Sequence, residues 1–142
     1  MDHIDRTRER YCQRGWGAGN QDVLWRYAAD DIEDVWHGTT GVQALVSVVR
    51  DLHETFPDPT LRVRDQAAGA GRVTTVWTVQ GTDVGGLLEL APTGRPVEMM
   101  AICLDDLVEG RIVHHQQVSD MFGVFRQLEV IPADWRAERL LR

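Results

Sequence analysis

The proline pair at residues 57–59 (PDP) divides the chain into two parts with different hydrophobic patterns. Before it, apolar residues recur at the three- and four-residue spacing of helices. After it, runs rich in Val, Thr and Ile alternate with tight glycine turns, which is typical of strands. Helices followed by successive strands predict an α+β fold, in which the N-terminal helices pack on a curved, mostly antiparallel sheet.

Three helices are expected before the proline pair. The first runs from Ile4 to Trp16, the second covers residues 21–29, and the third follows Thr39 or Thr40, either of which can cap it. A brief strand at residues 33–37 is expected between the second and the third. The apolar stripe of the third helix consists of Val42, Leu45, Val46, Val49, Leu52 and Phe56.

Strands are expected at residues 60–65, 72–81, 84–90, 97–108 and 111–119. Several links between them have the length of hairpin turns, such as EG at residues 109–110. The 142 residues contain no internal repeat and no interdomain linker, so a single domain over residues 1–142 is expected. Helices on one face of a curved sheet would enclose a pocket between the two layers.

Composition excludes several classes of function. The formal net charge of -7, without a basic stripe, argues against a nucleic-acid partner. All basic residues are arginine, so Schiff-base chemistry through a lysine is excluded. No apolar run predicts a membrane span, and the N-terminus lacks the apolar core of a signal peptide, which favours the cytoplasm. No motif for a metal ion or an organic cofactor is present.

Asp120 is the candidate catalytic residue of the last stretch, RIVHHQQVSDMFGVF. Strand parity places Ile112, His114, Gln116 and Asp120 on one side, which could face the pocket. Apolar surroundings would raise the pKa of the Asp120 carboxyl group and suit it to act as a base. Asp120 could instead cap the helix that begins near Met121, and the residues alone favour this structural role.

Other candidates have similar ambiguities. His114 could assist Asp120 as a second proton carrier, but it diverges from its neighbour His115, so the pair does not predict a metal site. Cys103 lies in an apolar run and is expected to be a buried, inert thiol. Large or pliable apolar side chains on short expected strands could line a cavity for a flat ligand, but most of them are expected to fill the core: Trp36, Trp77, Met99 and Met100. His37 has the same ambiguity as His114.

Several stretches together resemble the SnoaL-like polyketide cyclases, which have the ketosteroid-isomerase-like architecture. The resemblance is carried by WTVQGTDVGGLLELAPTGRPV (residues 77–97), EGRIVHHQQVSD (109–120) and MFGVFRQLEVIP (121–132), and more weakly by the first half. It covers nearly the whole chain and implies a cone-shaped barrel with an internal pocket. It also implies a homodimer, for which Ile102 and Leu104 are available on the outer sheet face.

The resemblance implies a catalytic role for Asp120, because the equivalent aspartate is the acid/base of these cyclases. The reaction would be an intramolecular aldol closure of a polyketide or aromatic intermediate in bacterial secondary metabolism, such as antibiotic biosynthesis, without a cofactor. A histidine and a glutamine of better-known cyclases align with Cys103 and Ala101, which cannot polarise a carbonyl group comparably. Candidates for the missing hydrogen bonds are His114, Gln116, His37 and Trp36.

Two alternatives stay open at this point. The replacements at Cys103 and Ala101 are compatible with epoxide opening or cofactor-free hydroxylation on the same scaffold. A non-catalytic module for small-molecule binding or dimerisation is the other alternative, since a fold does not determine a function. The substrate-binding residues expected for any of these are Trp36, His37, Trp77, Met99, Cys103 and Gln116.

Overall fold

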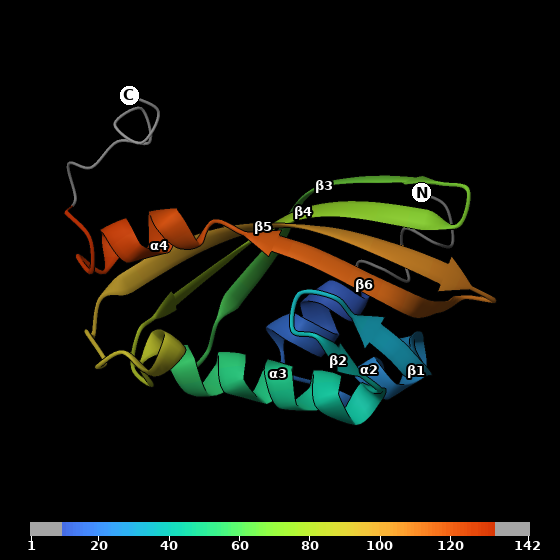
Figure 1. The fold of residues 1–142 in the computed structure, drawn as a ribbon, viewed down its shortest axis with the longest axis horizontal. Helices are drawn as coiled ribbons and strands as arrows, with labels where there is room; N and C mark the ends of the chain where they lie inside the picture. The colour runs from blue at the N-terminus through green and yellow to red at the C-terminus, as the bar shows by residue number, and fades with distance from the viewer. Residues whose placement is uncertain (1–9, 133–142) are drawn as a thin grey trace.

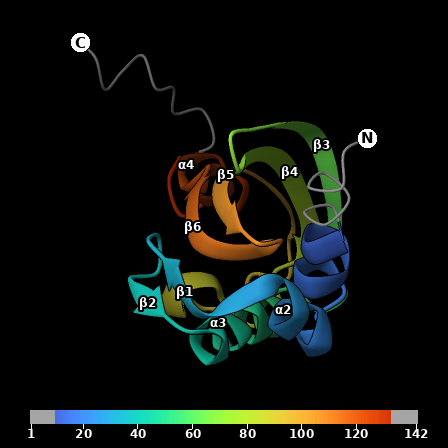
Figure 2. The same ribbon diagram turned by 90° about the vertical axis from the view of Figure 1, so that its right-hand side faces the viewer.

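The computed structural model describes residues 10–132. Within them, six strands form one sheet in the order β2-β1-β6-β5-β4-β3 (Figure 1). Figure 2 shows the sheet as an arc whose concave side is covered by η1, α2 and α3. The predicted α+β class and curved sheet are therefore confirmed, although the sheet does not close on itself. The part of the first expected helix that precedes residue 10 lies outside the described residues.

The elements follow one another in an order close to the predicted one. They are η1 (Tyr11–Gly17), α2 (Gln21–Tyr27), β1 (Ala28–Asp34), β2 (Thr39–Thr40), α3 (Val42–Thr55), β3 (Thr60–Gly69), β4 (Arg72–Thr82), η2 (Leu87–Glu89), β5 (Pro96–Val108), β6 (Arg111–Ser119) and α4 (Met121–Gln127). Strand neighbours run antiparallel, except that β1 lies parallel to β6.

The core fills the space between the sheet and the helices. The stripe of α3 is buried as predicted, except that Leu52 stays partly exposed. Fully burying one such side chain stabilises the fold by about 1.5–3 kcal/mol, so this stripe anchors α3 under the sheet. A second apolar cluster joins Phe56, Trp77 and Met99 to Val124 of α4 at the other end of the arc.

The start of α3 differs from the prediction. Gly41, with φ of 98°, is the N-cap residue, and a side chain at this backbone angle would be strained. Thr39 and Thr40 are not caps, because they form β2 and pair with Asp34 and Glu33 of β1. The strand expected at residues 33–37 begins earlier and ends at Asp34, since residues 35–38 turn to reach β2.

The strand expected at residues 84–90 is wrong, because these residues form a loop around η2. The buried carboxylate of Asp83 accepts hydrogen bonds from the backbone nitrogens of Gly86 (3.2 Å) and Thr93 (3.1 Å) and from the Thr93 hydroxyl (2.9 Å). The backbone nitrogens of Val84 and Gly85 donate to the Thr55 carbonyl at the end of α3. The segment is thereby attached to a helix instead of to another strand.

A bulge in β6 changes which side chains face inward. Leu107 pairs with Ile112, and Asp106 pairs with His114, so Val113 has no partner on β5. The predicted grouping of Ile112 with His114 is wrong, because the extra residue reverses the alternation. His115 and Gln117 point into the molecule and are buried, whereas His114 and Gln116 lie on the outer face of the sheet.

The outer face of the sheet carries exposed apolar residues. Met100 is 46%, Ile102 43% and Val118 68% exposed, and Ile102 and Val118 pair across β5 and β6. Leu104 is half-buried on the same face. The homodimer expected to use this face stays a prediction. Among the described residues, no helix has the length and apolar character needed to cross a membrane.

Candidate active site

A cavity of about 510 Å³ lies between the concave face of the sheet, α3 and the loop around η2. Its walls are largely apolar and include Trp36, Trp77 and Met99. The polar groups among them are few, as in most small-molecule sites, and include His37, Gln117 and Ser119. A chamber of this size accommodates a ligand of several rings.

The rim of the cavity is acidic. Asp51 and Glu54 on α3 and Glu89 at the end of η2 line it, and none of its described lining residues is an arginine. A phosphate or carboxylate on a ligand would meet carboxylates here and no compensating cation. The arrangement therefore disfavours anionic ligands.

The cavity wall contains four of the residues expected to bind a substrate, namely Trp36, His37, Trp77 and Met99. Cys103 lies deeper, beneath Trp77 and Gln117. Gln116 is on the outer face and is replaced at the cavity by its neighbour Gln117.

Asp120 is exposed and does not line the cavity, although its neighbours Ser119 and Met121 do. Its Oδ1 accepts a hydrogen bond of 2.9 Å from the backbone nitrogen of Gly123, so Asp120 caps α4. The structural role favoured by the residues alone is confirmed. The geometry provides no apolar surroundings that would adapt this carboxylate for proton abstraction from carbon.

His114 also lies away from the cavity. On the outer face of the sheet, its Nδ1 is 3.5 Å from Asp106 Oδ2 and its Nε2 is 4.0 Å from Glu33 Oε2. Asp106 is in turn paired with Arg72 at 2.6 Å. These partners form a solvated group of charges, and a histidine in it has no path to a bound ligand.

His37 and Asp34 form a dyad at the cavity wall. Asp34 is 2% exposed, and its carboxylate accepts hydrogen bonds from His37 Nδ1 (2.7 Å) and from the His37 backbone nitrogen (3.2 Å). Burial raises the pKa of Asp34, but the His37 hydrogen bonds and the charges of His115 and His37 outweigh it, and the pKa lies below 3.8. An ionised Asp34 keeps the proton of His37 on Nδ1 and leaves Nε2 as a base.

A second group of polar side chains is buried below the cavity. His115 and Asp105 are both 0% exposed, and His115 Nδ1 lies 2.5 Å from Asp105 Oδ1. The other ring nitrogen of His115 lies 3.4 Å from Gln117 Oε1. The Trp16 ring is tilted against the His115 ring with 5.8 Å between centroids. No group of three or more His, Cys, Asp or Glu side chains in residues 10–132 is arranged to hold a metal ion.

Sequence reasoning missed most of these polar residues. Asp34, Asp105, His115, Gln117 and Ser119 were not among the candidates. The bulge that turns His115 and Gln117 inward has no compositional signal. Asp105 did have a signal in the sequence. It continues the alternation of inward-facing residues Val97, Met99, Ala101 and Cys103, and a carboxylate at such a buried position requires a polar partner.

The loop around η2 closes one side of the cavity by a close backbone approach. A Cβ atom added to Gly85 would lie 2.2 Å from the Glu54 carbonyl oxygen, so no larger residue fits without displacing the loop from α3. Gly85, Gly86 and Leu87 line the cavity from this loop. The position of the loop therefore determines the shape of the chamber.

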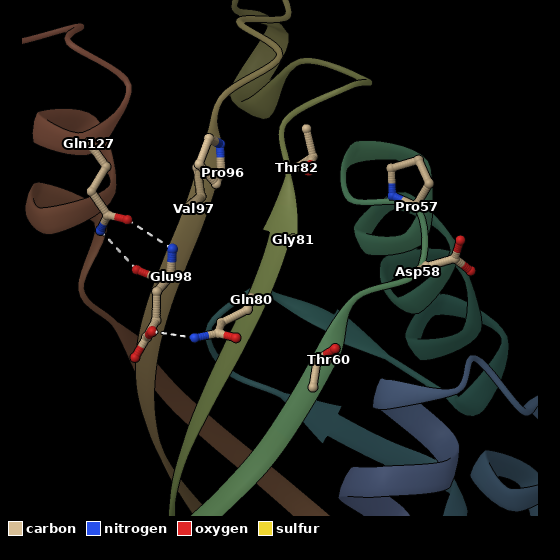
Figure 3. A pocket seen from close by; sticks show the side chains of 10 residues that line it. All are labelled: Pro57, Asp58, Thr60, Gln80, Gly81, Thr82, Pro96, Val97, Glu98 and Gln127. Carbon is tan, nitrogen blue, oxygen red and sulfur yellow. Dashed lines mark hydrogen bonds between the residues drawn. The ribbon is translucent and has the colours of Figure 1, made fainter.

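A second hollow, of about 690 Å³, lies near the ends of β3, β4 and β5 (Figure 3). It is open, and its polar side chains bond to one another: Gln80 Nε2 donates to Glu98 Oε2 at 2.6 Å. Gln127 of α4 bonds to the backbone of Glu98 through both amide atoms, each at 2.8 Å. Because Gln80, Glu98 and Gln127 already bond to one another and its walls are less apolar, this hollow is a weaker ligand site than the first cavity.

The sequence profile of the SnoaL-like polyketide cyclases matches residues 6–128. The chain belongs to this family. Among solved structures similar to this SnoaL-like chain is TsrD from Streptomyces laurentii, with a TM-score of 0.84 and 19% identity over 92% of this chain and 99% of that one. No curated protein sequence matches this SnoaL-like chain.

Two further neighbours differ in the activity suggested for them. IdmH from Streptomyces antibioticus, a proposed polyketide cyclase, has a TM-score of 0.77 and 25% identity over 89% of this SnoaL-like chain and 99% of its own. AclR from Streptomyces galilaeus, a proposed hydroxylase, has a TM-score of 0.81 and 22% identity over 97% and 87%. At 22% identity, the likeness to AclR shows a common fold and nothing further.

Proposed function

We propose that the protein is a cofactor-independent cyclase that closes a ring in an uncharged polyketide or related natural-product intermediate, with His37 as the general base. Membership of the SnoaL-like polyketide cyclases supports the reaction class. The observation that carries the proposal is the His37–Asp34 dyad, since it places an oriented imidazole in the wall of an apolar chamber. Among the residues that the structure describes, it is the His–carboxylate pair whose imidazole lies in the wall of this cavity.

The reaction is an intramolecular aldol closure. His37 Nε2 takes a proton from a carbon next to one carbonyl group, and the C–H electron pair becomes the enolate. The enolate carbon attacks a second carbonyl carbon of the same molecule, which forms the C–C bond and an alkoxide. The alkoxide then takes the proton back from His37, so the step requires no oxidant, reductant or second substrate.

The chamber favours this reaction in two ways. Its aromatic walls hold a flexible substrate folded, so that both carbonyl groups lie within reach of each other. Its low polarity strengthens every hydrogen bond to the developing oxyanion, since little water competes. Asp34 stabilises the imidazolium form of His37 during the reaction, as the carboxylate does in other His–Asp pairs.

The test uses His37→Gln, which keeps a side chain able to bond Asp34 but removes the base. The probe 2,6-heptanedione has two carbonyl groups in one flexible chain and closes to a cyclic β-hydroxy ketone. Acid treatment of the quenched samples removes water from this product, and the ultraviolet absorbance of the resulting cyclohexenone reports how much ring has closed. A general base contributes about 10²–10⁴-fold, so the variant's rate should fall by that factor. The matched control is His114→Gln on the outer face, for which the rate should not change.

The same assay separates the alternative reactions. An aryl epoxide supplied under nitrogen should not be opened, and oxygen should not be consumed with the diketone. If the wild type opens the epoxide and His37→Gln does not, His37 would remain the base, but the reaction would be epoxide opening instead of ring closure. Equal diketone turnover in the wild type and in His37→Gln would refute the assignment of His37.

A further inference from the structure

We infer that Ser119, oriented by Gln117, is the hydrogen-bond donor for a ketone or enolate oxygen on the substrate. This inference rests on the proposed function, because it adds the oxyanion-binding group to the same chamber. Ser119 and Gln117 both line the cavity and lie opposite Ala101 and Cys103 on β5. The donor role of Ser119 follows from the direction in which each hydrogen bond of this group runs.

A chain of hydrogen bonds begins at Trp77. An indole N–H can only donate, so Cys103 Sγ accepts from Trp77 Nε1 at 2.9 Å. The Cys103 thiol then donates to Gln117 Oε1 at 3.6 Å. This chain presents a donor to one end of the Gln117 amide and so places the amide oxygen at that end.

His115 lies on the same side of Gln117. Asp105 accepts from His115 Nδ1, and His115 Nε2 lies 3.4 Å from Gln117 Oε1. A neutral ring with its hydrogen on Nδ1 has none on Nε2 to donate, so the donor to the Gln117 oxygen is the Cys103 thiol.

The orientation of Gln117 determines what Ser119 can do. Gln117 Nε2 donates to Ser119 Oγ at 2.9 Å, so the serine oxygen is the acceptor in that bond. The hydroxyl hydrogen of Ser119 then points to another acceptor, and Ser119 is a half-buried part of the cavity wall. The ligand in this chamber that accepts such a hydrogen is a carbonyl or enolate oxygen.

The common direction of these bonds strengthens the last donor. From Trp77 through Cys103 and Gln117 to Ser119, every hydrogen bond runs in the same direction, and bonds aligned in this way polarise one another. Gln117 is 8% exposed, so water competes little for its amide. Ser119 is the group that touches the substrate, and Gln117 and Cys103 are positioning residues that act through it.

The test is binding of 1-tetralone, a bicyclic ketone, compared with tetralin, the same bicycle without oxygen. Quenching of tryptophan fluorescence reports both ligands. A hydrogen bond of ordinary strength corresponds to a roughly three- to tenfold change in Kd. Ser119→Ala should weaken 1-tetralone binding by that factor and leave the tetralin Kd within about twofold.

Ser47→Ala is the matched control, since Ser47 is the chain's other serine and bonds to Gln43 and Arg50 on α3. It should change neither affinity. Gln117→Glu, which keeps the shape but replaces the amide donor, should weaken the ketone alone, and Ser119→Thr should restore its affinity. Equal losses for both ligands in Ser119→Ala, no loss, or no binding to the wild type would overturn the inference.

The experiment is independent of turnover. His37→Gln should slow diketone closure by about 10²–10⁴-fold. It should change the Kd values of 1-tetralone and tetralin by the same factor, because Ser119 stays in place. Selective weakening of the ketone by Ser119→Ala, in a protein without cyclase activity, would support the oxygen subsite and refute the proposed function. If the protein closes the diketone but Ser119→Ala does not change its affinity for 1-tetralone, the proposed function would be supported and the oxygen subsite refuted.

Discussion

Substitution of Asp120 separates a helix cap from a catalytic acid. In the structure Asp120 makes one capping bond, of 2.9 Å to the Gly123 nitrogen, and its side chain is exposed. Asp120→Ala removes that acceptor and should cost about 0.5–2 kcal/mol of the free energy of unfolding. With roughly 4 °C per kcal/mol for a chain of this size, Tm should fall by about 2–8 °C.

Asp120→Asn gives the decisive comparison. Asparagine caps helices about as well as aspartate, so this variant should lose only the attraction of the charge to the helix end, about 0.3–1 kcal/mol. Diketone closure should proceed at the wild-type rate. Differential scanning calorimetry measures the stability, and the enone absorbance measures the rate.

Gly123→Ala is an independent check on the same cap. A Cβ atom there would lie 2.4 Å from Asp120 Oδ2, so the carboxylate must leave its capping position. The variant should therefore lose stability even though alanine favours helices. A rate reduced a hundredfold in folded Asp120→Asn would refute our reasoning, because it would make Asp120 the acid/base and His37 dispensable.

Two further predictions concern Asp34 and Gly85. Because the folded pKa of Asp34 is lowered, its ionisation stabilises the fold above the unfolded pKa of 3.8, and this contribution disappears as pH falls through the folded pKa. Asp34→Asn should therefore be less stable than wild type at pH 7 in urea titrations, with a gap that narrows below pH 4; a constant gap would contradict this. Gly85→Ala should destabilise the fold by about 1–3 kcal/mol through its clash with Glu54 and weaken 1-tetralone binding, and unchanged values of both would contradict the close approach.

The sequence predicted those elements whose hydrophobic period is long and unbroken. The stripe of α3 repeats over four turns, and β6 was bounded by the EG turn and by the start of α4, so both were located closely. Residues 84–90 are an apolar run of strand length, but the backbone nitrogens of Val84 and Gly85 donate to the Thr55 carbonyl and that of Gly86 donates to Asp83, instead of to a neighbouring strand. Such a contact depends on tertiary structure, and local propensity does not contain it.

The site was harder to predict than the fold. Trp36 and Trp77 could be named as possible cavity-lining residues, but the sequence favoured the core for most side chains of this kind, and only the structure puts both in the wall. The inward-facing residues of β6 could not be predicted, because one unpaired residue, Val113, reverses the sheet face on which each later residue of the strand lies. Asp120 resembles a catalytic acid in sequence and a cap in space, and only coordinates distinguish the two.

The bulge at Val113 has a consequence for relatives of this chain. The letters HHQQVS contain two interleaved linings, one of His, Gln and Val and the other of His, Gln and Ser, and the backbone selects which of them a ligand meets. A homologue that kept all six letters but lost the unpaired residue would show its ligand a valine where this chain offers a hydroxyl. Transferring site residues between such proteins by alignment alone would then match identical letters that face opposite ways.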